Sequence, residues 1–220
     1  MLGELFSPVW WQQSLLLLPL LLMSFAYHEY AHALVAYRLG DSSQKEKGRL
    51  TTNPFKHINL LGFLAFFLTG FGWAKAVRTD NSAFKNPKRD LALVALSGPF
   101  ANLLLAVFFN ILLFLFRLFV SEAALKTSMF LAITEVFLFY GIYFNIVQVA
   151  LNLLPIPPLD GSRVLYSILP SSLLNSVYLL ERIGPYILIF LVFSGVIGRI
   201  LNPIIDFLIT GLFLIYRVFQ

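Results

Sequence analysis

Residues 14–38 read SLLLLPLLLMSFAYHEYAHALVAYR, and this stretch decides how the rest of the chain is interpreted. The apolar run from Ser14 to Tyr37 is longer than the roughly 20 residues that a helix needs to cross a bilayer. Its second half nevertheless carries His28, Glu29 and His32. Ionisable side chains are costly at membrane depth, so three of them in one span indicate a functional site.

The spacing of these three residues predicts a zinc site. Positions four apart lie on one face of a helix, so His28 and His32 can offer nitrogen atoms to the same metal ion. Glu29 is adjacent and within reach of a water on that metal, as in the H-E-x-x-H pattern of zinc enzymes. The alternative is two histidines hydrogen-bonded inside a helical bundle, with Glu29 paired to a cation. That alternative gives the buried carboxylate no evident role.

Composition predicts an all-α polytopic membrane protein. The 220 residues are 59% hydrophobic and 12% charged, whereas soluble domains are nearer about half apolar and a quarter charged. We expect residues 1–220 to form a single membrane-embedded domain, with a core at about 14–161 and C-terminal helices at 173–218. The net charge of +5 comes from basic residues in short loops; this pattern indicates membrane topology rather than nucleic-acid binding. The absence of cysteine leaves nitrogen and oxygen as metal ligands.

Hydropathy divides the chain into about five spans and one shorter apolar segment. The expected spans are Ser14–Tyr37, Leu91–Phe116, Ser128–Leu154, Leu173–Ile197 and Ile204–Tyr216, with Gly198–Pro203 separating the last two. Ile58–Phe71 is too short to cross and is predicted to be re-entrant. Gly72–Thr79 partly alternates apolar and polar residues, so we expect a short strand there that pairs with Gly48–Asn53.

A catalytic zinc usually has three protein ligands and an open position, so a third ligand is needed. His57 and Asp160 are the candidates, because both lie close to prolines that restrict the backbone. Asp160 is preferred: it follows the end of a predicted span on a segment with three prolines, whereas His57 is expected to be a turn residue.

Five segments in consistent order, from about residue 26 to 161, resemble the site-2 protease family of intramembrane zinc metalloproteases. They are HEYAH (28–32), GRLTTNPFKHIN (48–59), FGWAKAVR (71–78), SGPFAN (97–102) and NLLPIPPLDG (152–161). The match is to the compact prokaryotic type without a PDZ or CBS domain. The resemblance implies one Zn²⁺ per chain, bound by His28, His32 and Asp160. It also implies Glu29 as the catalytic base and Asn102 as a contact for the substrate or the oxyanion. The alternative for Asn102 is an amide that caps or cross-links helices.

The predicted function is that of an intramembrane zinc metalloendopeptidase that takes part in regulated intramembrane proteolysis. A zinc-activated water attacks a peptide carbonyl within or near a transmembrane segment of a membrane protein, with Glu29 as general base. The rival from another class is a non-catalytic membrane protein that binds or transports metal, which predicts further ligands in other spans. A prenyl-protein protease is a second rival, disfavoured by the LDG and GPxxN segments. The sequence indicates no oligomeric state.

Membrane topology follows from the requirement that the ligands meet. If Ile58–Phe71 does not cross, the two spans before Asp160 bring it back to the face on which the first span ends. The loops on that face carry ten of the sixteen basic residues, namely Arg38, Lys45, Lys47, Arg49, Lys56, Lys75, Arg78, Lys85, Lys88 and Arg89. The positive-inside rule therefore predicts a multi-pass protein of the cell (plasma) membrane whose active site lies towards the cytoplasmic side.

Overall fold

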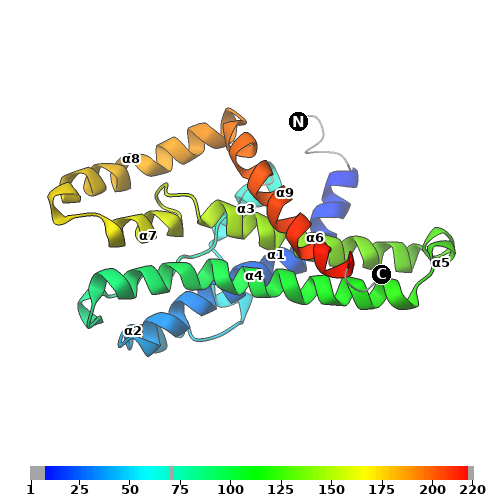
Figure 1. The fold of residues 1–220 in the computed structure, drawn as a ribbon, viewed down its shortest axis with the longest axis horizontal. Coiled ribbons are helices and arrows are strands. Elements are labelled where there is room, and N and C mark those ends of the chain that lie inside the picture. Colours follow the sequence, from blue (N-terminus) through cyan, green and yellow to red (C-terminus); the bar gives the residue numbers. More distant parts are fainter. Residues whose placement is uncertain (1–7, 70–71, 218–220) are drawn as a thin grey trace.

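The computed structural model describes residues 8–69 and 72–217, and these are predominantly helical (Figure 1). In chain order, with 3-10 turns written η, the elements are α1 (Pro8–Arg38), α2 (Ser43–Glu46), η1 (Pro54–Lys56), α3 (Leu60–Thr69), η2 (Asn81–Ala83), α4 (Pro87–Phe119), α5 (Glu122–Thr127), α6 (Met129–Asn152), α7 (Asp160–Ile168), η3 (Ser171–Leu173), α8 (Leu174–Phe193) and α9 (Val196–Arg217).

Four helices of the described ranges are long and apolar enough to cross a membrane: Ser14–Arg38 of α1, all of α4 and α6, and Val196–Leu214 of α9. The four candidate spans fit a membrane protein, and the expected helical character is confirmed. The expected number of five spans is not, because α8 is not among the four within the described residues. The interior of α8 carries two adjacent charged residues, Glu181 and Arg182.

The centre of the fold is a bundle of α1, α4 and α6, with α4 in contact with both of the others (Figure 1). Ser24 contacts Asn102, while His32, further along α1, contacts Val94, so α1 and α4 run antiparallel. After the short α5 the chain returns along α4 as α6, which therefore runs in the same direction as α1. The two helices therefore end on the same side of the bundle, as the predicted topology requires.

Apolar side chains fill most of the bundle interior, among them Leu20, Phe109, Leu113, Ile142 and Ile146. Polar side chains are buried in the same bundle, including an asparagine on α4 and another on α6. In lipid there is no hydrophobic force between helices, so close packing and interhelical hydrogen bonds hold a bundle together. These buried amides matter for the site described below.

The segment that contains α3 leaves the bundle and returns to the same place. Ile58 and Ala74 form an isolated antiparallel bridge, and the Lys75 N–H donates to the His57 carbonyl at 2.7 Å. The 10 residues of α3 span about 15 Å, half of a hydrocarbon core of about 30 Å. The predicted strands are not confirmed: apart from this bridge, no ladder is present in the described residues. Ala74 meets residues after η1 rather than Gly48–Asn53, because η1 turns the chain.

The turn between the last two helices lies earlier than predicted. α8 and α9 are separated at Gly195, whose φ of +73° is in the left-handed region that glycine adopts without strain. The predicted separator Gly198–Pro203 lies inside α9 instead. A proline within a helix removes one backbone hydrogen bond and kinks the helix, so Pro203 need not end it.

The loop after α1 is anchored by the buried carboxylate of Asp41. Its oxygens accept hydrogen bonds from the Ser43 N–H at 3.1 Å, the Gln44 side chain at 2.8 Å and the Asp80 N–H at 2.9 Å. Burial by itself raises the pKa of Asp41, but these hydrogen bonds outweigh it and hold the pKa below its ordinary value. The carboxylate ties the loop after α1 to the chain segment that leads into α4.

Candidate metal centre

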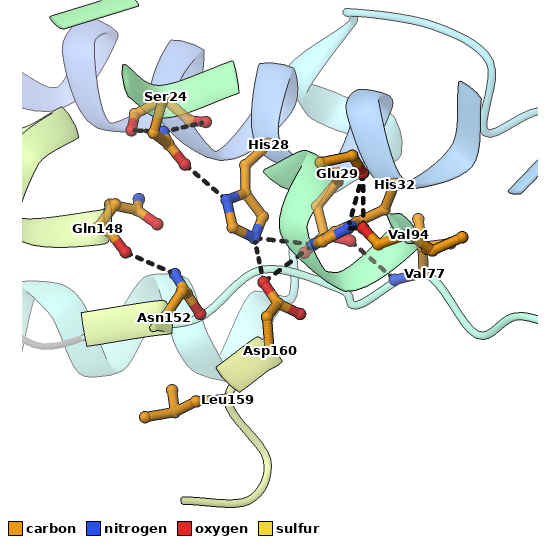
Figure 2. Close-up of polar contacts among 12 residues, drawn as sticks. Ser24, His28, Glu29, His32, Val77, Val94, Gln148, Asn152, Leu159 and Asp160 are labelled. Carbon is orange, nitrogen blue, oxygen red and sulfur yellow. Dashed lines mark hydrogen bonds and ion pairs between the residues drawn. The ribbon is translucent and has the colours of Figure 1, made fainter. Parts of the chain in front are cut away.

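The three predicted ligands converge although His32 and Asp160 are 128 residues apart in the sequence (Figure 2). His28 and His32 extend from α1, and Asp160 is the first residue of α7. The Nε2 atoms of the two imidazoles lie 3.0 Å apart, and each lies 3.1 Å from Oδ2 of Asp160. All three residues are buried. Among the described residues, they are the only group of three or more potential metal-binding side chains.

The cluster fits a zinc ion. Zinc bonds to nitrogen and oxygen are roughly 2.0–2.2 Å long, so tetrahedral coordination places neighbouring ligand atoms about 3.3 Å apart. The observed separations of 3.0 and 3.1 Å are close to this value. Two imidazoles and one carboxylate are also a ligand set of known catalytic zinc sites, which leave the fourth position open.

Asp160 owes its place to α7, a nine-residue helix that was not expected from the sequence. A Cβ added to Gly161 would lie 2.4 Å from the carbonyl oxygens of Leu153 and Leu154, so α7 packs directly against the end of α6. Burial by itself raises the pKa of Asp160, but the neighbouring imidazoles, that of His32 above all, outweigh it and hold the pKa well below its usual range. The ionised carboxylate is the form that binds a cation.

Both histidines are held through Nδ1, on the side of each ring away from the cluster. Nδ1 of His32 lies 2.7 Å from the carbonyl oxygen of Val94, which can only accept a hydrogen bond. Nδ1 of His32 is therefore protonated, and its Nε2 presents a lone pair to the cluster. Nδ1 of His28 lies 2.5 Å from Oδ1 of Asn102. Histidines that bind metals usually donate their second ring N–H in this manner.

Glu29 lies beside the cluster, and its carboxylate is held by the extended segment that follows α3 (Figure 2). Its Oε2 accepts a hydrogen bond from the Val77 N–H at 2.8 Å, and both residues are buried. The segment predicted to be a strand thus orients the predicted base. This contact could not be predicted from the sequence, because every residue except proline has a backbone N–H.

Gly98 permits the close approach of α4 to the two histidines. A Cβ at this position would lie 2.5 Å from Nε2 of His32 and 2.6 Å from Cε1 of His28. Any side chain here would collide with both rings. The glycine of the SGPFAN segment thus serves close helix packing.

The cluster opens into a cavity of about 400 Å³, which is large enough for several residues of a peptide. Its walls include Trp73, Ala74 and Ala76 from the extended segment, and Leu188 and Ile189 from α8. Three polar side chains that the sequence analysis did not place in the site also line it: Gln148, Asn152 and Arg163. They share no motif with the histidines, so only the fold brings them there.

Two further candidates from the sequence lie elsewhere. His57 is buried away from the cluster, and its Nε2 contacts the Thr51 carbonyl at 2.8 Å, as suits the predicted turn residue. Asn102 is completely buried behind His28 and is not among the residues that line the cavity. Its side chain faces neighbouring helices rather than the space where a substrate would lie.

Comparison with known proteins identifies the family. The sequence profile of peptidase family M50 matches residues 16–194. The chain belongs to peptidase family M50. This family contains the site-2 proteases, so the resemblance seen in the motifs is confirmed. The match includes both histidines, Glu29 and Asp160.

Two relatives illustrate the similarity. The chain is 35% identical over 188 residues to the Bacillus subtilis (strain 168) protein named "Putative zinc metalloprotease YwhC", with 84% of each chain covered. It is 36% identical over 145 residues to "Putative zinc metalloprotease Rip2" of Mycolicibacterium smegmatis, covering 64% of this chain and 52% of the relative. No solved structure matches the chain. Membership of M50 and these relatives support a zinc metalloprotease function.

Proposed function

We propose that this protein is an intramembrane zinc metalloendopeptidase of the site-2 type, with Glu29 as its general base. The observation that carries the proposal is the buried cluster of His28, His32 and Asp160. Two of these ligands lie, with Glu29 beside them, on a helix apolar enough to span a membrane. Buried ionisable groups at membrane depth are expensive and are retained for function.

The residues divide the chemistry between them. His28, His32 and Asp160 would hold one zinc ion per chain, since their ligand atoms converge. Zinc, when bound, polarises a peptide carbonyl and makes water a nucleophile near neutral pH. Glu29 accepts the proton of the attacking water and delivers it to the leaving amine nitrogen. Oε2 of Glu29 is held by the Val77 N–H, so we assign the proton transfer to the other carboxylate oxygen.

The proposed substrate is a transmembrane protein or peptide that unwinds locally inside the cavity. A helix conceals its peptide bonds in its own hydrogen bonds, so the scissile segment must be extended before attack. The extended segment that includes Ala74 and Ala76 lines the cavity next to the cluster. Addition of the substrate as a strand along this segment would use backbone hydrogen bonds and little side-chain recognition.

We further propose that the protein is a multi-pass plasma-membrane protein whose site faces the cytoplasm. The support is the basic content of the loops at the end of α1 and before α4, on the face where Asp160 lies. Because the chain has no cysteine, Ser42→Cys and Ser82→Cys should resist an impermeant thiol reagent in intact cells. Ala123→Cys, in α5 on the opposite face, should be labelled; labelling of Ser82→Cys from outside would contradict this topology.

A metal-transport role predicts further ligands along the other spans. The carboxylate of Glu135 in α6 instead forms an ion pair with Arg117 at 2.8 Å. Since the described residues contain no second metal-binding cluster, the protease is the function that we propose.

The deciding experiment compares wild type with Glu29→Gln for zinc content and for cleavage of a panel of single-span membrane proteins. Glu29→Gln should retain zinc but cleave about 100-fold or more slowly, because an amide cannot carry the proton. His32→Ala should lose both zinc and cleavage. Cleavage by Glu29→Gln at the wild-type rate would refute the proposed mechanism.

A further inference from the structure

Behind His28, three buried polar side chains form a hydrogen-bonded network that joins three helices. Ser24 of α1, Asn102 of α4 and Asn145 of α6 are each 0% exposed. Nδ2 of Asn102 lies 2.8 Å from Oγ of Ser24 and 2.9 Å from Oδ1 of Asn145, and Oγ of Ser24 donates to the same Oδ1 at 3.0 Å. Burying polar groups is unfavourable unless they are bonded, so a fully bonded network in this apolar bundle needs an explanation.

Two backbone carbonyls determine the direction of every hydrogen bond in the network. The amide nitrogen of Asn145 donates to the Gly141 carbonyl at 2.8 Å, so its Oδ1 must face Ser24 and Asn102. The side-chain nitrogen of Asn102 lies 3.3 Å from the Ser24 carbonyl, which only accepts. Oδ1 of Asn102 therefore faces His28 and accepts from it, which places the imidazole proton on Nδ1.

We propose that Asn102, held in place by Ser24 and Asn145, is a positioning residue for the metal ligand His28. Oδ1 of Asn102 accepts a hydrogen bond from the Nδ1–H of His28. This bond selects the tautomer whose Nε2 lone pair faces His32 and Asp160, and it fixes the plane of the imidazole ring. This rests on the proposed function only in taking the cluster as a zinc site. Oδ1 and Nδ2 of Asn102 are both engaged in the network and lie outside the cavity lining, so Asn102 is not the donor to an oxyanion.

The difference between the two histidines explains why the network is needed. His32 is held by the Val94 carbonyl, which is part of a helix and cannot rotate. His28 is held by a side chain, whose amide would turn freely if nothing engaged its other end. Ser24 and Asn145 engage that end from two helices, so the Asn102 amide has a single orientation.

The test compares two substitutions of Asn102, of which only one keeps an acceptor for the N–H of His28. Asn102→Asp keeps an oxygen that accepts the His28 proton, while Asn102→Leu removes it at similar volume. Asn110→Leu is the matched control: it is another buried asparagine of α4, and its amide donates to the Leu212 carbonyl at 3.1 Å, away from the cluster. Zinc affinity is measured by competition with a chelator, and ligand geometry by the absorption spectrum of the cobalt-loaded protein.

Asn102→Leu should bind zinc about 10- to 100-fold more weakly and shift the cobalt spectrum, since loss of an outer partner of a ligand has this effect. Asn102→Asp should lose less affinity than Asn102→Leu, because it keeps the acceptor for His28 although it loses the donor to Ser24 and Asn145. Asn110→Leu should be unchanged. The proposal is overturned if Asn102→Leu binds zinc as tightly as wild type and loses only turnover, which is the behaviour of an oxyanion contact. It is equally overturned if Asn102→Asp loses as much affinity as Asn102→Leu.

Ser24→Ala provides a second test that does not depend on how the bundle tolerates leucine. It removes one hydroxyl from the network and leaves Asn102 in place, so a smaller loss of zinc affinity and the same direction of spectral change are expected. An unchanged spectrum and affinity would contradict the proposal. A wild-type chain that binds no zinc would refute the proposed function as well, whereas equal binding by all variants would refute only the positioning role.

Discussion

Replacing Gly98 by alanine should disable the metal centre while leaving the bundle folded. The added Cβ would lie 2.5 Å from Nε2 of His32 and 2.6 Å from Cε1 of His28. Non-bonded heavy atoms attract at about 3.5–4.0 Å and repel at shorter distances. The two rings must therefore retreat by about 1 Å, away from the position where they meet Asp160.

A displacement of this size exceeds what a zinc site accepts. Ligand distances in metal sites hold within about 0.2 Å, and loss of a single outer-shell contact already weakens zinc binding about 10- to 100-fold. Because Gly98→Ala moves two ligands directly, we expect zinc affinity to fall by about 100-fold or more. The overpacking itself costs about 1–3 kcal/mol, less than the roughly 5–15 kcal/mol by which folded domains are stable.

The assay is chelator competition for zinc, together with cleavage of a membrane substrate and thermal unfolding in detergent. Gly198→Ala and Gly211→Ala in α9 are the matched controls, because a Cβ at either position meets nothing within 4 Å. Both controls should bind zinc normally. If Gly98→Ala bound zinc with wild-type affinity, the reasoning about the approach of α4 to the histidines would be refuted.

Three further predictions follow from other contacts. Val77→Pro removes the N–H that holds Glu29, so cleavage should fall about tenfold or more at normal zinc affinity; Val77→Leu, which keeps the N–H, should cleave normally, and equal rates for both would contradict the contact. Gly161→Ala places a methyl 2.4 Å from two carbonyl oxygens at the end of α6, so Asp160 should be displaced and zinc content should drop; full zinc content would contradict that packing. Asp41→Asn should lower thermal stability at pH 7. Because the pKa of Asp41 is lowered by folding, its stabilisation is complete above the unfolded value of about 3.9 and is lost as the pH falls through the folded value. The thermal stabilities of wild type and Asp41→Asn should therefore converge at low pH. A difference in stability that persists at low pH would contradict the role of the charge on Asp41.

The pair of histidines could be predicted from the sequence because its geometry is local. A helix places His28 and His32 on one face whatever surrounds it, and the length of the apolar run identifies that helix. Composition alone also predicted a helical membrane protein, and four helices of the described residues are apolar and long enough to cross a membrane. The sequence also predicted that α1 and α6 end on the same side, because the chain direction reverses at each predicted membrane crossing and two crossings separate their ends.

The short helix α7 and the position of the turn between α8 and α9 could not be predicted in the same way. α7 is amphipathic but only nine residues long and follows a proline-rich turn, and a helix this short is difficult to recognise between two longer apolar runs. The break at Gly195, rather than at Gly198–Pro203, depends on which glycine adopts a positive φ. The expected strand pairing failed for a related reason, because the turn η1 decides which residues reach Ala74.

The sequence by itself predicted a metal-binding helix in a membrane, with Asp160 as the preferred third ligand, and the three residues do converge. Only the tertiary structure decided what Asn102 and Val77 touch, since a residue type names a donor or an acceptor but not its partner. Asn102 is 74 residues from His28, and Val77 is 48 residues from Glu29. Contacts over such separations arise from the packing of α1, α4 and the segment after α3, which no local pattern encodes.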